Sequence, residues 1–259
     1  MNKANSNQWL WHEREGQRWL TCALLQDWPH SFSSRHSAPE RPDVLAPTQL
    51  GLEGSAAHWT KQVHGDRLVW SADSSAPPTS LLEADAIASD SPGNSVWVRT
   101  ADCVPVLVAD GARVAAIHSG WRGTSAEIVA KTVTEMVQRG SSPATLRVAV
   151  GPAISGPVYQ VSSEVAERVL ATIPHLHNPK RSSITDLPSV IHEDEEPGKV
   201  RLDLRAAIAY QLLEIGIHPL NICLSPHCTW GDPDNFFSYR RLQSPPSPVQ
   251  WSGIGLLHS

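Results

Sequence analysis

The sequence lacks several features that would place it in a specialised class. It has no run of about eighteen apolar residues, so we expect no membrane-spanning helix. No apolar signal region follows the first residues, so we expect no secretory leader. Only four cysteines occur in 259 residues, and none belongs to a Cys-x-x-Cys pair. A disulfide framework is therefore not indicated, and we expect a cytoplasmic protein with free thiols.

Excess positive charge is also missing. The chain has 21 Lys and Arg against 26 Asp and Glu, which gives a net charge of -5. Binding to nucleic acid or to a membrane surface needs clustered positive charge, so we expect neither partner. A hydrophobic fraction of 41% with 18% charged residues is typical of a globular protein. The length suits one large domain, and we predict a single domain over residues 1–259.

The expected secondary structure is a mixture without regular βαβ alternation, which indicates an α+β fold. Apolar runs predict strands within 19–25, 67–70, 84–89, 95–99, 104–109, 113–118, 146–150 and 222–224. Three helices are expected: one from a capping box at 124–127 to Gly140, one from Ser162 or Ser163 to about Ile173, and one from Asp203 to Gly216. Residues 174–199, with four prolines and an acidic run, are expected to form an exposed loop.

The clearest local prediction is a β-hairpin. Val104–Ala109 and Arg113–His118 are apolar strands, and the Asp-Gly sequence between them favours a two-residue turn at Gly111-Ala112. In that register, Cys103 and His118 point to the same face of the sheet. They become diagonal neighbours roughly 7–8 Å apart, which is close enough for two ligands of one metal.

His64 is a third candidate ligand from another segment. Three protein ligands and one open position are typical of catalytic zinc. Asp102 neighbours Cys103 and is expected to point away from the metal, where a carboxylate can orient a ligand. Taken alone, a cysteine in an apolar hairpin is usually a core residue, and a single histidine is usually structural.

Copper is the alternative metal, because two histidines and one cysteine also form electron-transfer copper sites. Those sites usually add an axial methionine. Met136 lies on the packed face of a predicted helix, which leaves Gln62 as the substitute. A multicopper oxidase needs several His-x-His pairs, and the sequence has one, at 175–177.

The segment Gly120-Trp121-Arg122-Gly123 follows the hairpin. Its two glycines allow a close approach to a ligand, and N–H groups at a helix start attract anions. Arg122 adds a planar donor for phosphate or carboxylate. The alternative is a plain strand-to-helix turn. We expect substrate or anion contacts from Gly120, Arg122 and Gly123, and from Asp85 and Gln62 in the preceding motifs.

Taken in order, six motifs resemble the YfiH family, formerly described as multicopper polyphenol oxidase (laccase) domains and now as purine nucleoside phosphorylases. The resemblance runs from about residue 30 to residue 241. The motifs are Lys61-Gln62-Val63-His64-Gly65, Ala84-Asp85-Ala86, Thr100-Ala101-Asp102-Cys103, His118-Ser119-Gly120-Trp121-Arg122-Gly123, Gly151-Pro152-Ala153-Ile154 and Phe236-Phe237-Ser238-Tyr239-Arg240-Arg241.

The resemblance implies a single layered α/β/β/α domain with mixed sheets. It implies zinc held by His64, Cys103 and His118, which would also be the catalytic residues. The implied reactions are phosphorolysis of adenosine, inosine, guanosine and S-methyl-5'-thioadenosine, and deamination of adenosine. The partners would then be a purine nucleoside and phosphate, with the chain acting as a monomer or small homo-oligomer. A cysteine hydrolase that edits peptidoglycan precursors and a copper polyphenol oxidase are the alternatives.

Three departures from the family pattern concern substrate contacts. Residues 36–56 lack the Asn-Leu-Gly and Gly-Asp-Asp-Pro motifs common in the family, so the resemblance implies no substrate contact from that region. The cysteine usual after Gly-Pro-Ala-Ile is replaced by the segment Ser155–Tyr159. The C-terminal arginine pair is followed by Leu242-Gln243 in place of the common Asp. We therefore expect the substrate preference to differ from that of other members.

Overall fold

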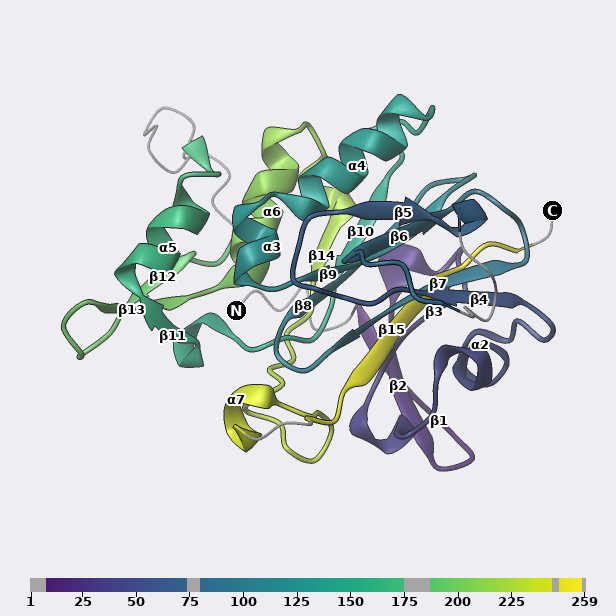
Figure 1. Ribbon diagram of the computed structural model, residues 1–259, viewed down its shortest axis with the longest axis horizontal. Helices are drawn as coiled ribbons and strands as arrows, with labels where there is room; N and C mark the ends of the chain where they lie inside the picture. Colours follow the sequence, from purple (N-terminus) through teal and green to yellow (C-terminus); the bar gives the residue numbers. More distant parts are fainter. Residues whose placement is uncertain (1–7, 74–79, 175–186, 244–246, 258–259) are drawn as a thin grey trace.

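Two mixed six-stranded sheets lie face to face in the computed structural model, which describes residues 8–73, 80–174, 187–243 and 247–257 (Figure 1). The first sheet has the order β1 (Trp9–Arg14), β2 (Gln17–Cys22), β3 (His30–Ser33), β15 (Gln250–Gly255), β7 (Asn94–Thr100) and β4 (Ala56–Trp59). The second has the order β14 (Ile222–Leu224), β10 (Arg147–Val150), β8 (Val104–Ala109), β9 (Val114–Ser119), β6 (Ala86–Ser89) and β5 (Leu68–Trp70).

Helices cover the outer faces of the two sheets, which gives four layers (Figure 1). Helix α2 (Pro42–Leu50) packs on the first sheet. The second sheet is covered by α3 (Trp121–Ser125), α4 (Ile128–Gln138), α5 (Ser163–Leu170) and α6 (Leu204–Glu214). A small sheet of β11 (Gln160–Ser162), β13 (Lys199–Leu202) and β12 (Ile191–Glu193) and the short helix α7 (Tyr239–Leu242) complete the described part. The predicted layered α+β architecture is confirmed.

Strand β8 explains why the layers hold together. Its residues are all buried, because alternate side chains enter two different cores. Val104, Val106 and Val108 pack against the helices. Leu107 and Ala109 pack against the first sheet. A continuous apolar run is therefore what a strand in the middle of this sandwich requires.

Two predictions about secondary structure were wrong, and one strand was not predicted. The unpredicted strand is β15, at 250–255, which lies between β3 and β7 in the middle of the first sheet. The expected loop at 174–199 contains β12 and the start of β13, and its residues 175–186 lie outside the described part. The helix expected to begin at the capping box is two helices, divided at Glu127, whose φ is 60°. No helix in the described ranges has the length and apolar character needed to cross a membrane.

Candidate metal centre

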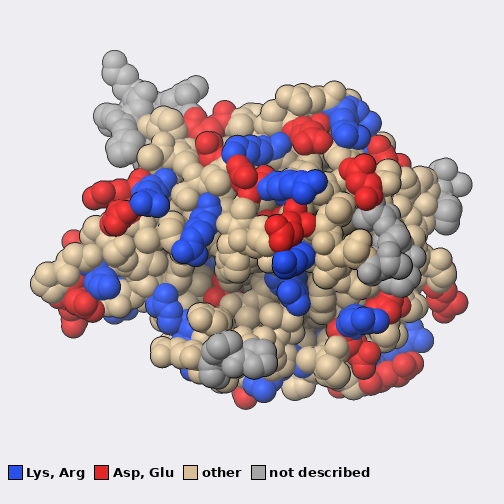
Figure 2. Space-filling view, in the orientation of Figure 1, with Lys and Arg blue, Asp and Glu red and all other residues tan. Residues whose placement is uncertain are grey.

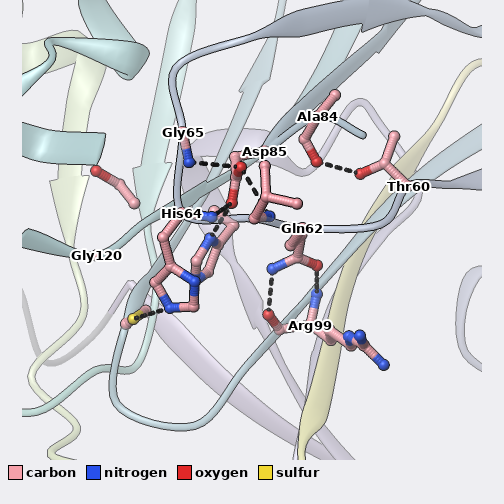
Figure 3. Close-up of polar contacts among 12 residues, drawn as sticks. Thr60, Gln62, His64, Gly65, Ala84, Asp85, Arg99 and Gly120 are labelled. Carbon is pink, nitrogen blue, oxygen red and sulfur yellow. Dashed lines mark hydrogen bonds and ion pairs between the residues drawn. The ribbon is translucent and has the colours of Figure 1, made fainter. Parts of the chain in front are cut away.

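His64, Cys103 and His118 converge at one end of the second sheet (Figure 3). Their ligand atoms all lie within 4.8 Å of one another. The Sγ atom of Cys103 is 4.0 Å from Nε2 of His64, and the two imidazole rings meet edge to face with centroids 4.8 Å apart. His64 is exposed, Cys103 half-buried and His118 buried, so the group opens toward solvent on the His64 side.

The predicted hairpin is confirmed and accounts for two of these three side chains. Pro105 pairs with His118, and the N–H of Asp110 donates to the carbonyl of Arg113 at 3.0 Å across the two-residue turn. Cys103, however, lies just before β8 rather than within it. The backbone of Asp102 has a φ of 94° at this point, so the thiol direction depends on a local turn as well as on strand alternation.

Asp85 lies next to His64 and also contacts His118 (Figure 3). Its fully buried carboxylate accepts a hydrogen bond from Nδ1 of His118 at 2.8 Å. It also accepts from the backbone N–H groups of Val63, His64 and Gly65 at 3.1, 2.9 and 2.8 Å. We expected Asp85 to contact the substrate, but its position is that of a group that orients two ligands from within the protein.

Hydrogen bonding outweighs burial at this carboxylate. Burial by itself would raise the pKa of Asp85, whereas the bonds from His118, Gly65 and Val63 lower it below its ordinary value. Asp85 therefore stays ionised and accepts from Nδ1 of His118. The Nε2 atom of that ring is then the one available for a metal.

The Cys103 thiolate and the protonated His118 imidazole stabilise each other as an ion pair. Burial raises the pKa of Cys103, but the charge and hydrogen bonds of His118 and His64 lower it to about 6. Burial lowers the pKa of His118, but the Cys103 charge and the Asp85 hydrogen bond raise it to about 9. The metal-free site therefore holds a thiolate near neutral pH, which is the form of cysteine that binds metals.

Gly120 leaves the space that the ligands occupy. A Cβ atom at this position would lie 2.9 Å from Sγ of Cys103 and 3.4 Å from Cδ2 of His64. Gly123 is similarly close-packed, since its Cβ would lie 3.3 Å from Ile128 and 3.4 Å from the carbonyl oxygen of Gly65. Both glycines are therefore explained by packing around the ligands.

The turn after the hairpin differs from the prediction. The helix begins at Trp121, with Gly120 at its N-cap, and α3 has only five residues. Thr124 does not cap a helix start, because its hydroxyl bonds the carbonyl of Gly120 at 3.0 Å. The cationic group that this turn presents is Arg122, whose guanidinium lies 4.6 Å from the ring centroid of Trp121.

The amide of Gln62, a predicted substrate contact, is hydrogen-bonded to the backbone of Arg99. Its amide nitrogen donates to the carbonyl of Arg99, and its amide oxygen accepts from the N–H of the same residue, both at 2.8 Å (Figure 3). The side chain thus holds the His64 loop against β7. Gln62 therefore stabilises the loop that carries His64 through its bonds to Arg99.

Sequence reasoning did not place Tyr159 at the site. Its pKa is raised to about 12 by burial and by the Cys103 charge, while Arg240 and Arg122 act in the opposite direction. Arg240 lies 5.1 Å from the Tyr159 ring centroid. The sequence does contain the motif Tyr239-Arg240-Arg241, whose Arg240 contacts Tyr159. Its spacing does not indicate that this C-terminal segment lies beside the hairpin.

The donor set fits zinc. Ligand atoms around a tetrahedral zinc lie roughly 3.5 Å apart, so the observed separations need only a small adjustment. Two imidazole nitrogens and one thiolate suit zinc, and the space above Gly120 is kept free of side chain. Within the described residues, this is the one group of three or more such side chains. The His-x-His pair at 175–177 lies outside the described residues.

Curated proteins similar to this chain include enzymes that are named for reactions of purine nucleosides. A curated purine nucleoside phosphorylase from Synechocystis sp. is 43% identical over 258 residues, covering 95% of this chain and 96% of that protein. The adenosine deaminase RL5 of an unknown prokaryotic organism is 30% identical over 202 residues, covering 75% and 73%. These relatives are enzymes of nucleoside metabolism, and the present protein is an enzyme of this kind.

Structural similarity extends over nearly the whole chain. The crystal structure of YlmD from Geobacillus stearothermophilus matches with a TM-score of 0.81 at 22% identity, covering 96% of this chain and 99% of that one. The structure of the Bacillus licheniformis hypothetical protein YfiH matches with a TM-score of 0.78 at 23% identity, covering 95% and 98%. Residues 40–254 match the family model described as multi-copper polyphenol oxidoreductase laccase, and the chain therefore belongs to this family, the YfiH family.

Proposed function

We propose that this protein is a zinc-dependent purine nucleoside phosphorylase. Its substrates would be adenosine, inosine, guanosine and S-methyl-5'-thioadenosine, and it would also deaminate adenosine. The observation that carries the proposal is the His64, Cys103 and His118 group, built into a chain that is 43% identical to a purine nucleoside phosphorylase over almost its full length.

Each residue near the group has a distinct role in this proposal. His64, Cys103 and His118 would hold zinc, which supplies Lewis acidity toward a water molecule or a substrate oxygen when bound. Asp85 keeps the His118 ring in one orientation through its Nδ1 hydrogen bond. Arg122 would bind phosphate, because a guanidinium offers paired N–H donors to oxyanions.

The surface supports a small-molecule substrate. Lys and Arg side chains alternate with Asp and Glu over the face shown in Figure 2, with no broad patch of positive charge there. Nucleic-acid binding depends on such a patch. All four cysteines, Cys22, Cys103, Cys223 and Cys228, are free, which is consistent with the cytoplasm as the compartment.

A cysteine hydrolase is the second candidate. The favouring observation is the pair formed by Cys103, whose pKa is lowered to about 6, and His118. A thiolate beside an imidazole is a nucleophile arrangement. Zinc bound to the same sulfur would occupy the nucleophile, so the two functions predict opposite effects of the metal. A copper polyphenol oxidase is the third candidate. The description of the family favours it, and the donor set of two histidines and one cysteine also occurs in copper sites.

The test uses protein loaded with one zinc per chain, with inosine and inorganic phosphate. Phosphorolysis gives hypoxanthine and ribose 1-phosphate, and adenosine without phosphate gives inosine and ammonia. Cys103→Ala should abolish both reactions, whereas Cys228→Ser, which changes a cysteine outside the ligand group, should retain them. Activity that survives chelation and is lost on alkylation of Cys103 would instead support the hydrolase. Oxygen consumption with a phenol and bound copper would support the oxidase.

A further inference from the structure

Arg240 is an arginine whose position is tightly defined but whose charge is not neutralised. Its guanidinium donates from one nitrogen to the carbonyl of Gln160 at 3.1 Å and lies over the ring of Tyr159. No carboxylate of the described residues lies within 4 Å of this guanidinium. Five N–H donors are present on a guanidinium, so most of them remain for a ligand.

The backbone of Arg240 is fixed by the residue next to the cysteine ligand. The Asp102 carboxylate accepts from the Arg240 N–H at 2.7 Å and from the Ser238 hydroxyl at 2.9 Å. Its other oxygen accepts from the Thr229 hydroxyl at 2.6 Å. Asp102, Ser238 and Thr229 are all buried, so this connection between the C-terminal segment and the hairpin is shielded from water.

The backbone of Asp102 is strained in the conformation that makes this connection. A non-glycine residue with a φ of 94° is strained, and such residues persist only where the surroundings hold them. The same turn sets the direction of Cys103 on one side and the direction of the carboxylate on the other. One residue thus links the position of a metal ligand to the position of Arg240.

A second unneutralised arginine among the described residues is Arg122, on the short helix α3 that directly follows β9. Arg122 lies over Trp121 and also has no carboxylate within 4 Å among the described residues. Arg122 is two residues after Gly120, where a Cβ would lie 2.9 Å from Sγ of Cys103, and the backbone of Arg240 is bonded to Asp102, the residue before Cys103. The two arginines therefore stand on segments that both adjoin Cys103, and the Tyr159 ring lies under the Arg240 guanidinium. Two arginines and a phenol hydroxyl beside a metal centre are suited to a tetrahedral oxyanion.

We propose that Arg240 is the second phosphate-binding cation of this enzyme, together with Arg122, and that Asp102 is the positioning residue that holds Arg240 in place relative to Cys103. The ligand is inorganic phosphate, the co-substrate of the reaction proposed above, so this inference rests on that function. Tyr159 supports the Arg240 guanidinium through its ring and remains neutral at pH 7, so its hydroxyl can donate to a phosphate oxygen.

The experiment compares Arg240→Gln, Arg240→Lys and Asp102→Asn with the wild type. Arg14→Gln is the matched control, because it removes the same charge from an exposed side chain on β1. Phosphate binding to the zinc-loaded protein is measured by calorimetry, which requires no turnover. The KM for phosphate and the KM for inosine are measured separately, and zinc content is determined for each variant.

We expect Arg240→Gln to raise the Kd and the KM for phosphate about ten-fold or more, with the KM for inosine within two-fold of wild type. Arg240→Lys should recover part of the loss. Asp102→Asn should raise the Kd for phosphate as Arg240→Gln does, while retaining zinc. The double variant Asp102→Asn/Arg240→Gln should have the same phosphate Kd as Arg240→Gln alone, because both changes act through the same guanidinium.

Two outcomes would overturn the inference. One is a phosphate Kd in Arg240→Gln within two-fold of wild type and of Arg14→Gln. The other is a phosphate defect in Asp102→Asn that appears only with loss of zinc. Phosphate binding that depends on Arg240 in a protein without phosphorolysis would retain the inference and reject the proposed function. Phosphorolysis by Arg240→Gln with an unchanged KM for phosphate would retain the proposed function and reject the inference.

Discussion

The Nδ1 atom of His118 lies 2.8 Å from Oδ1 of Asp85, and that same oxygen accepts the backbone N–H of His64 at 2.9 Å. One buried carboxylate oxygen thus touches two of the three candidate metal ligands, one through its ring and one through its backbone. The carboxylate therefore determines both the tautomer of the first histidine and the position of the loop that carries the second.

Asp85→Asn tests this arrangement. An asparagine keeps one acceptor oxygen and places an NH2 donor at the other position. Either the N–H groups of His118 and His64 or those of Val63 and Gly65 therefore face a donor and lose their partner. We expect zinc affinity to fall by about 10–100-fold, the usual range for groups that orient a metal ligand. Competition with a chromogenic chelator measures the affinity. Glu83→Gln is the control, since Glu83 is exposed and pairs with Lys61. Equal affinities in the two variants would contradict the assigned role.

Gly120→Ala tests the space beside the ligands. The added methyl group would stand 2.9 Å from Sγ of Cys103, which is closer than real Cβ contacts allow. We expect a folded protein that binds less than one zinc per chain and has little activity. Gly111→Ala is the matched control, because a Cβ there meets nothing within 4 Å. Full zinc content in Gly120→Ala would show that the site can rearrange around a side chain.

The pH dependence of Cys103 alkylation follows from its environment. In metal-free protein, the His118 and His64 interactions outweigh burial and bring the pKa of the thiol to about 6. Because the thiolate is the reactive form, the rate should rise with pH to a plateau with a midpoint near pH 6. In His118→Gln the midpoint should shift toward the ordinary value of about 8.5. Iodoacetamide labelling followed by peptide mass spectrometry measures it, and a midpoint above pH 8 in the wild type would refute the assignment.

Gly253→Ala tests the central position of the last strand. A Cβ on Gly253 would overlap the buried ring of Trp97 on the neighbouring strand. Overpacking of a core costs about 1–3 kcal/mol, so we expect a clear drop in the free energy of unfolding in urea. The Gly111→Ala protein again serves for comparison. An unchanged midpoint would mean that β15 is not held against β7 in solution.

Local signals predicted the parts of the site that depend on local structure. The Asp-Gly turn fixed the register of the hairpin, because Asp110 Oδ1 accepts the N–H groups of Ala112 and Arg113 at 2.9 and 2.8 Å. The caps at Ser162 and Asp203 were found for the same reason, since each side chain bonds N–H groups two or three residues ahead.

Contacts between residues far apart in the sequence could not be predicted from local patterns. Strand β15 has two glycines in six residues, and its position follows from strands far away in the sequence. The motif around Asp85 predicts a substrate contact, because spacing gives the residue type but not the direction of the side chain, which is buried. Arg240 reaches the hairpin through Asp102, across 138 residues, and no local pattern indicates that contact.

The three candidate metal ligands come from a loop, from a turn before β8 and from the end of β9, so an unfolded chain has no preassembled site. Any cation that binds there stabilises the native state by mass action, by about 2.7 kcal/mol at a free concentration one hundred times its Kd. With zinc as that cation, as proposed above, the lifetime of this protein in a cell would depend on the supply of free zinc as well as on the sequence. Metal starvation would lower the amount of folded enzyme in addition to its activity.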